Sequence, residues 1–146
     1  MAEQVKIAVK SRSRFGGQED VLVFRGHGTL EKIPEGWHLR YEAANEADGS
    51  AIVSDVKLET ATRRAVVINE ADSGGYGLLL DPKTPTATRI DGGDGGALML
   101  NVVTEEVAWQ LSRQGHGFIT LAYTLLIGAQ PLSALRVELT LTKEEN

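Results

Sequence analysis

Hydrophobic and polar residues alternate strictly along most of this chain. In residues 4–14, Val5, Ile7 and Val9 alternate with polar or small neighbours. Successive side chains of a β-strand point to opposite faces, so this period of two predicts a strand with one apolar face. The same pattern predicts strands over residues 20–32, 37–42, 52–59, 64–71, 76–81, 84–91, 97–103, 118–128 and 132–143. The sequence therefore predicts an all-β protein of about ten strands.

One segment, residues 104–113, fits two structures. Val107 and Leu111 are four residues apart, as on one face of a helix that Gly115 would end. Val107, Trp109 and Leu111 also alternate with polar or small residues, as in a strand. We favour the strand, because the surrounding segments are all joined by short hairpin turns.

Many strands joined by short turns leave two architectures, a sandwich and a closed barrel. We favour a single antiparallel, closed barrel over residues 1–146. The first and last segments, 4–14 and 132–143, are long and uninterrupted, and each would expose a free edge unless the two paired. Within the second segment, Gly26-His27-Gly28 predicts a bend, as a bulge or a barrel corner.

Composition narrows the class of protein. The chain has 146 residues, of which 42% are hydrophobic, enough to bury one core. It has no cysteine, which excludes disulfides and thiol chemistry. No segment has the length of a membrane helix and no signal peptide is visible, so we expect a cytoplasmic protein that does not insert into membranes. The net charge of −5 disfavours nucleic acid as a partner.

The order of segments resembles the YwiB-like family, small bacterial proteins of unknown function. The matching pieces are Val5-Lys6-Ile7-Ala8-Val9-Lys10-Ser11, Val23-Phe24-Arg25-Gly26-His27-Gly28, Leu39-Arg40-Tyr41-Glu42 and Gly117-Phe118-Ile119-Thr120-Leu121-Ala122-Tyr123. This resemblance implies a calycin-type, lipocalin-like β-barrel. The chain departs from the family at Val67-Ile68-Asn69-Glu70 and Thr88-Arg89-Ile90-Asp91-Gly92, where an Arg-x-Gly and a Thr-x-Tyr-Gly segment are expected.

The barrel interior is the first candidate for function. Trp37 and Tyr41 share the inward parity of their strand, and Tyr123 has the inward parity of its own. A barrel of this size either fills with side chains or holds one small ligand. We therefore predict that these aromatic residues line a site for a small apolar or amphipathic molecule. Arg25 and Arg89 are candidates to bind an anionic head group, although the alternation assigns neither to a face.

The outer face of the first strand is the second candidate. Lys6, Lys10, Arg12 and Arg14 share one parity and form a basic row. Such a row can bind an acidic partner, a protein or a nucleic acid, or it can be a solvated face balanced by acids such as Glu138. No aromatic residue interleaves with it, as a base-stacking surface would need. Two barrels could also pair through strand edges or outer apolar positions such as Val53 and Leu79.

The sequence contains no recognisable catalytic constellation, so we expect a non-enzymatic protein without a cofactor or metal. The histidines His27, His38 and His116 lack the spacing of a metal site. The segment Asp91-Gly92-Gly93-Asp94-Gly95 has the composition of some calcium loops, but without the spacing of an EF-hand we expect an exposed turn.

Overall fold

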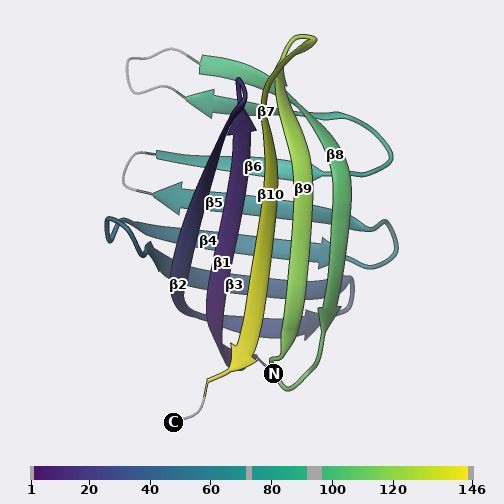
Figure 1. Cartoon of the computed structure of the whole chain (residues 1–146). Helices are drawn as coiled ribbons and strands as arrows, with labels where there is room; N and C mark the ends of the chain where they lie inside the picture. The colour runs from purple at the N-terminus through teal and green to yellow at the C-terminus, as the bar shows by residue number, and fades with distance from the viewer. Residues whose placement is uncertain (1, 72–73, 92–96, 145–146) are drawn as a thin grey trace.

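The computed structural model describes residues 2–71, 74–91 and 97–144, and these form one antiparallel sheet of ten strands that curls into a nearly closed barrel (Figure 1). The strands are β1 (Glu3–Phe15), β2 (Gln18–Ile33), β3 (Gly36–Asn45), β4 (Ala51–Glu59), β5 (Arg64–Ala71), β6 (Gly74–Leu80), β7 (Thr86–Asp91), β8 (Ala97–Leu111), β9 (Gly117–Ile127) and β10 (Gln130–Lys143). No helix occurs in these residues, and so none that could span a membrane. The all-β barrel expected from the alternation is confirmed.

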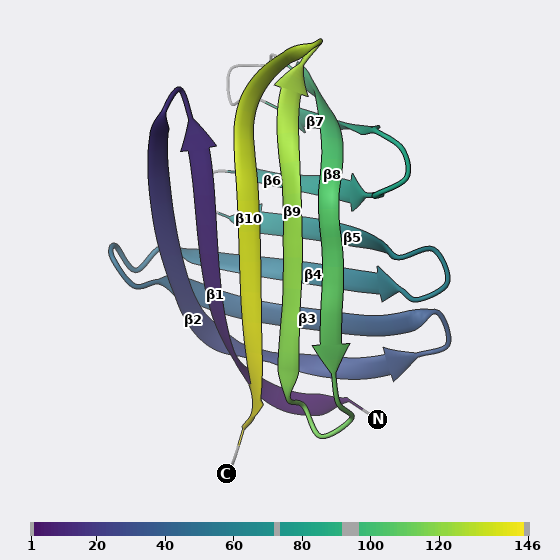
Figure 2. The same ribbon diagram turned by 45° about the vertical axis from the view of Figure 1, so that its right-hand side comes forward.

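The strands form two groups that face each other. β1, β10, β9 and β8 run upright in one wall, and β3 to β7 run across behind them (Figure 2). The inner faces of both groups supply one continuous core, in which Leu39, Ile119 and Leu141 are fully or almost fully buried. Each such side chain contributes about 1.5–3 kcal/mol by leaving water.

The bend between the two groups lies in β2. Gly26 and Gly28 face the inside of the barrel, directly opposite Ala43 and Tyr41 of β3. A Cβ atom on Gly26 would lie 1.9 Å from the carbonyl oxygen of Glu42. Only glycine therefore allows the two strands to approach this closely. The pairing with β3 continues without a register shift, so the glycines form a corner and not a bulge.

The segment that fitted both helix and strand is part of β8. Residues 97–103 and most of 104–113 form one long strand. Its register against β9 shifts between Thr104 and Glu106, which leaves Glu105 as the extra residue of a bulge. Thr104 is buried before the bulge and Val107 after it. The inward-facing residues of β8 therefore have even numbers before the bulge and odd numbers after it.

The barrel closes in two different ways. β1 and β10 pair over the register Val5–Lys143 to Arg14–Ala134, which confirms the pairing expected of the first and last strands. β6 and β7 are the two edges of the sheet and lie side by side. Across this seam, the hydroxyl of Thr86 donates to the carbonyl of Leu79 at 2.6 Å, and Thr88 donates to the carbonyl of Gly77. Side-chain hydroxyls thus join β6 and β7.

Candidate functional site

A row of polar side chains crosses the inner face of β3 to β6. Tyr41 lies opposite Ser54, Ser54 opposite Asn69, and Asn69 opposite Tyr76. Residues opposite each other in antiparallel strands are direct neighbours on the same face. The Ser54 hydroxyl donates to Oδ1 of Asn69 and is also in hydrogen-bond contact with the Tyr41 phenol. We call Tyr41, Ser54, Asn69 and Tyr76 the polar row.

Tyr123 reaches the polar row from the opposite wall of the barrel. It lies on the inner face of β9, where it is 5% exposed, and Tyr41 is 6% exposed. After burial, which is the largest cause, electrostatic interactions with Tyr76 and Tyr41 raise its pKa, as is expected for phenols that share one interior. Tyr76, 37% exposed, is the member that reaches solvent. We call Tyr41, Tyr76 and Tyr123 the tyrosine cluster.

Thr104 adds an unsatisfied hydroxyl to this end of the interior. It lies directly opposite Tyr123 on β8 and is 7% exposed. Its Oγ1 is buried and has no hydrogen-bond partner. A buried hydroxyl without a partner costs about 1–3 kcal/mol. Thr104 therefore carries a hydrogen-bonding group that its own surroundings leave unsatisfied.

Burial raises the pKa of two phenols, Tyr41 and Tyr123. Loss of hydration is the largest cause that raises the pKa of Tyr41 and of Tyr123 above the usual value, and for Tyr123 the neighbouring phenols add to the increase. At neutral pH both side chains are uncharged and can each donate one hydrogen bond.

These raised pKa values predict a loss of stability in alkali. The folded protein holds the Tyr123 proton more tightly than the unfolded chain, whose tyrosine pKa is about 10. The stabilisation is complete below that pH and decreases as pH rises above it, by up to about 1.4 kcal/mol per pH unit for each buried tyrosine. We expect Tyr123→Phe to flatten this dependence in urea unfolding measured from pH 9 to pH 11. Equal slopes for the two proteins would contradict the assignment.

Of the other residues predicted to line the interior, Trp37 faces inward but lies away from the tyrosine cluster, and the two arginines are exposed. Trp37 lies about 13 Å before Tyr41 along β3. It lines a separate hollow with Leu30, and Lys32 Nζ lies 5.4 Å from the centre of the Trp37 ring. The Arg25 side chain is 67% exposed on the outer face and forms an ion pair with Glu46. Arg89 is also exposed, next to the inward-facing Thr88. The structure thus brings Tyr41 and Tyr123 together, without Trp37 or the two arginines.

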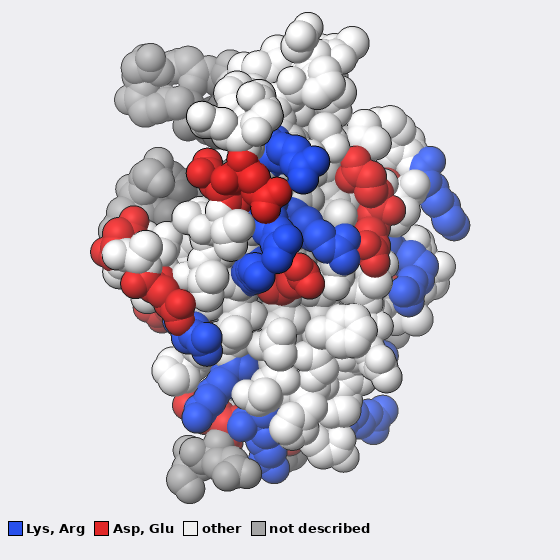
Figure 3. Space-filling model, viewed as in Figure 1, with Lys and Arg blue, Asp and Glu red and all other residues white. Residues whose placement is uncertain are grey.

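The basic row on β1 lies on the outer face, as the alternation predicted. Lys6, Lys10, Arg12 and Arg14 are all exposed. Figure 3 shows Lys and Arg gathered in the middle of this wall, with Asp and Glu on both sides. Arg136 was not predicted to belong to this row, although Arg136 lies in β10 directly opposite Arg12. The pairing register of the first and last strands was the missing information.

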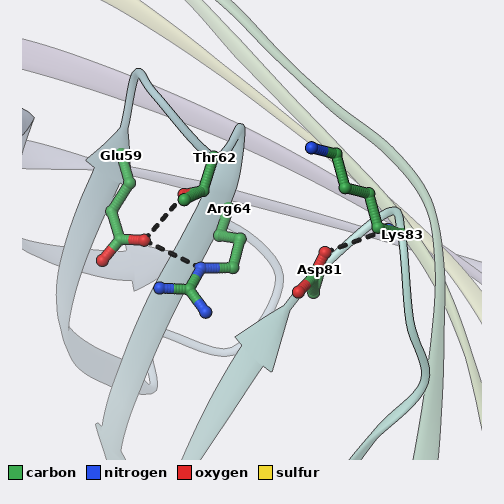
Figure 4. Close-up of polar contacts among 5 residues, drawn as sticks. All are labelled: Glu59, Thr62, Arg64, Asp81 and Lys83. Atoms are coloured by element: carbon green, nitrogen blue, oxygen red, sulfur yellow. Dashed lines mark hydrogen bonds and ion pairs between the residues drawn. The ribbon is translucent and has the colours of Figure 1, made fainter.

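Other charged side chains among the described residues stabilise turns or lie on the surface. At the β4–β5 turn, Glu59 Oε1 accepts hydrogen bonds from Thr62 Oγ1 at 2.8 Å and Arg64 Nε at 2.9 Å (Figure 4). These bonds, the one from Thr62 first, hold the Glu59 pKa below its usual range. Near it, Asp81 accepts from the backbone N–H of Lys83 at 2.9 Å. Both carboxylates therefore have a structural role, which is to stabilise their turns.

The histidines lie apart from one another. His27 contacts Glu144, and His38 contacts Asp55 on the outer face of β3 and β4. In the described ranges, no three His, Asp or Glu side chains are grouped as metal ligands. Most of the glycine-rich segment weighed as a calcium loop, residues 92–95, lies outside the described residues.

Sequence reasoning missed four members of the interior site: Ser54, Asn69, Tyr76 and Thr104. Parity alone could have found Ser54, Asn69 and Tyr76, because each shares the face of buried apolar residues in its own strand. Thr104 was hidden by the bulge at Glu105.

Comparison with known proteins supports the fold. No family model and no curated protein matches the sequence. The structure is similar to the crystal structure of the YwiB protein from Bacillus subtilis, with a TM-score of 0.78. The two chains are 18% identical, and the match covers 99% of this chain and 94% of YwiB. At this identity the similarity shows a common fold alone.

Proposed function

We propose that the barrel binds a small amphipathic molecule in its interior, with the polar part of that molecule at the tyrosine cluster. The observation that carries the proposal is the buried Thr104 hydroxyl, which has no hydrogen-bond partner although Tyr123 lies directly opposite it. Native proteins satisfy almost all such groups, so an unsatisfied one beside a polar cluster points to a bound molecule.

The chemistry of the site favours an uncharged polar group on the ligand. The buried polar residues of the described part are all neutral: Asn45, Ser54, Thr88, Thr104 and Thr120. An ion without a partner of opposite charge would lose its hydration here at a large cost in free energy. The protonated phenols of Tyr41 and Tyr123 are donors, which suit a carbonyl, amide or hydroxyl oxygen.

The rest of the ligand would lie against apolar side chains. Leu121 and Leu125 flank Tyr123 on the inner face of β9, and Leu78 follows Tyr76 on β6. Because Tyr76 is partly exposed, the tyrosine cluster meets solvent at β6. A ligand with an apolar body and one uncharged polar end matches this arrangement.

We also propose that the chain is a cytoplasmic member of the YwiB-like family with a calycin-type barrel. The resemblance of four segments and the similarity of fold over 99% of the chain support this assignment. Calycin-type barrels include interior ligand carriers, so the assignment agrees with interior binding by analogy of fold.

The proposal predicts opposite effects of Thr104→Val on stability and on binding. Valine has nearly the same shape and removes the unsatisfied hydroxyl, so the free protein should become more stable by about 1 kcal/mol. The same change removes a hydrogen bond to the ligand and should weaken binding about fivefold. Binding is measured by the fluorescence of Nile red, an uncharged amphipathic dye, and native mass spectrometry of protein purified from cells tests for a molecule already bound.

Thr140→Val is the matched control, because Thr140 is exposed on the outer face of β10. It should leave Nile red binding unchanged, whereas Tyr123→Phe should weaken it as Thr104→Val does. Equal Nile red affinity in all variants, together with no additional mass on protein from cells, would show that the interior is filled by side chains alone.

A further inference from the structure

Three arginines line a hollow on the outer face of the barrel, on the other side of the wall that carries Tyr123. The hollow has a volume of about 340 Å³ and is lined by Arg12 and Arg14 of β1, by Ala134 and Arg136 of β10, and by Ala122 of β9. Alanine side chains are short and arginines long, so a depression forms with methyl groups on its floor and guanidinium groups on its walls. We call this hollow the arginine pit.

The positive charges in the arginine pit are only partly balanced by ion pairs. Arg12 lies directly opposite Arg136, and like charges in this position repel. Arg136 contacts Glu106 at 3.0 Å and Glu138 at 3.9 Å, and Arg14 contacts Glu19 at 3.3 Å. Within the described residues, Arg12 makes no ion pair. An anion bound between Arg12 and Arg136 would relieve the repulsion and give Arg12 its partner.

Acidic residues at the rim restrict the size of that anion. Glu19 and Glu105 line opposite sides of the arginine pit, and Figure 3 shows acidic groups on both sides of the basic centre. A polyanion that continued past the arginines, such as a nucleic acid, would meet these carboxylates and be repelled. A compact anion that ends inside the hollow avoids them.

We propose that the arginine pit binds the phosphate group of a small phosphate ester. Guanidinium groups form paired, charge-assisted hydrogen bonds with phosphate oxygens, and two facing arginines can each supply two donors. The ion pairs of Arg14 and Arg136 are exposed and therefore weak, so both side chains can turn toward phosphate at little cost. The alanine floor accommodates an apolar or ring-shaped part of the ester, and the volume is that of a small-molecule site. This site does not depend on the interior ligand.

The test is a titration of the ¹⁵N-labelled full chain with phenyl phosphate, followed by NMR at constant ionic strength set with chloride. We expect saturable shifts of the Ser13, Ala122 and Thr124 amides, which line the arginine pit. Arg12→Gln and Arg136→Gln should each weaken binding at least about tenfold. Lys6→Gln is the matched control, since Lys6 is an exposed cation of the same strand outside the arginine pit, and should leave the affinity unchanged.

A second measurement separates binding from a structural role. Arg12→Gln relieves a like-charge contact, so its melting temperature without phosphate should equal or exceed that of the wild type. The titration is repeated with inorganic phosphate. Binding as tight as that of phenyl phosphate would show that the phosphate group alone is recognised, which also supports the site.

Four outcomes would overturn the proposal: no saturable shift with either compound, equal weakening by Lys6→Gln, a lower melting temperature of Arg12→Gln, or tighter binding of a single-stranded oligonucleotide. The oligonucleotide result would indicate an extended basic surface along β1 instead of a compact site.

Discussion

Replacing Gly26 by alanine is expected to lower the free energy of unfolding by about 3 kcal/mol. A Cβ atom at this position would lie 1.9 Å from the carbonyl oxygen of Glu42 and 2.6 Å from Cα of Ala43. Both are backbone atoms of β3, so no side chain can rotate away, and the two strands must separate at the corner where the sheet turns. Urea unfolding of the variant measures the loss.

Gly77→Ala is the control for this prediction. Gly77 is also a strand residue, in β6, but a Cβ there would have its nearest contacts at 3.9 Å. Alanine restricts the unfolded chain more than glycine does, so this variant should gain about 0.5 kcal/mol. If both variants lost the same stability, the close approach of β2 and β3 would not be the cause.

The double substitution Thr86→Val and Thr88→Val is expected to cost about 2–4 kcal/mol. Each threonine hydroxyl donates across the seam to a carbonyl of β6, from Leu79 or Gly77. Valine keeps the shape of threonine and removes the donor, so two carbonyls lose their partners. The loss is measured by urea unfolding, and amide hydrogen exchange should become faster in β6 and β7 before it does in β1 and β10.

The matched control for the seam is Thr140→Val with Thr142→Val. These two threonines are exposed on the outer face of β10, and their replacement should change stability by less than about 0.5 kcal/mol. Equal losses in the two double variants, or unchanged exchange in β6 and β7, would show that the hydroxyls do not hold the seam.

The alternation of hydrophobic and polar residues predicted the strands because most inner faces are uniformly apolar. Trp37, Leu39 and Tyr41 repeat without interruption, and β3 could be recognised from them alone. The bulge in β8 could not be recognised, because one added residue at Glu105 leaves the pattern regular on both sides and only exchanges the inward parity. Thr104 was consequently placed at the boundary between the predicted segments 97–103 and 104–113.

The candidate sites depend on register, which a single sequence does not contain. Tyr41 and Tyr123 could be assigned inward by parity, but the polar row depends on which residues of β4 to β6 lie opposite one another. Arg12 could likewise be placed outward, while its position opposite Arg136 required the exact pairing of β1 with β10. Parity gives the face of a residue, and register gives its neighbours.

The pairing of β1 with β10 also affects how the protein can be made. A ribosome releases β1 first and β10 last, so one edge of β1 stays without its partner during most of synthesis. Free strand edges are sites of aggregation, and natural proteins protect them with charged side chains, lysine above all. Lys6, Lys10, Arg12 and Arg14 occupy this edge strand in the nascent chain. We therefore expect the basic row to act before the barrel exists, by opposing the pairing of incomplete chains with each other.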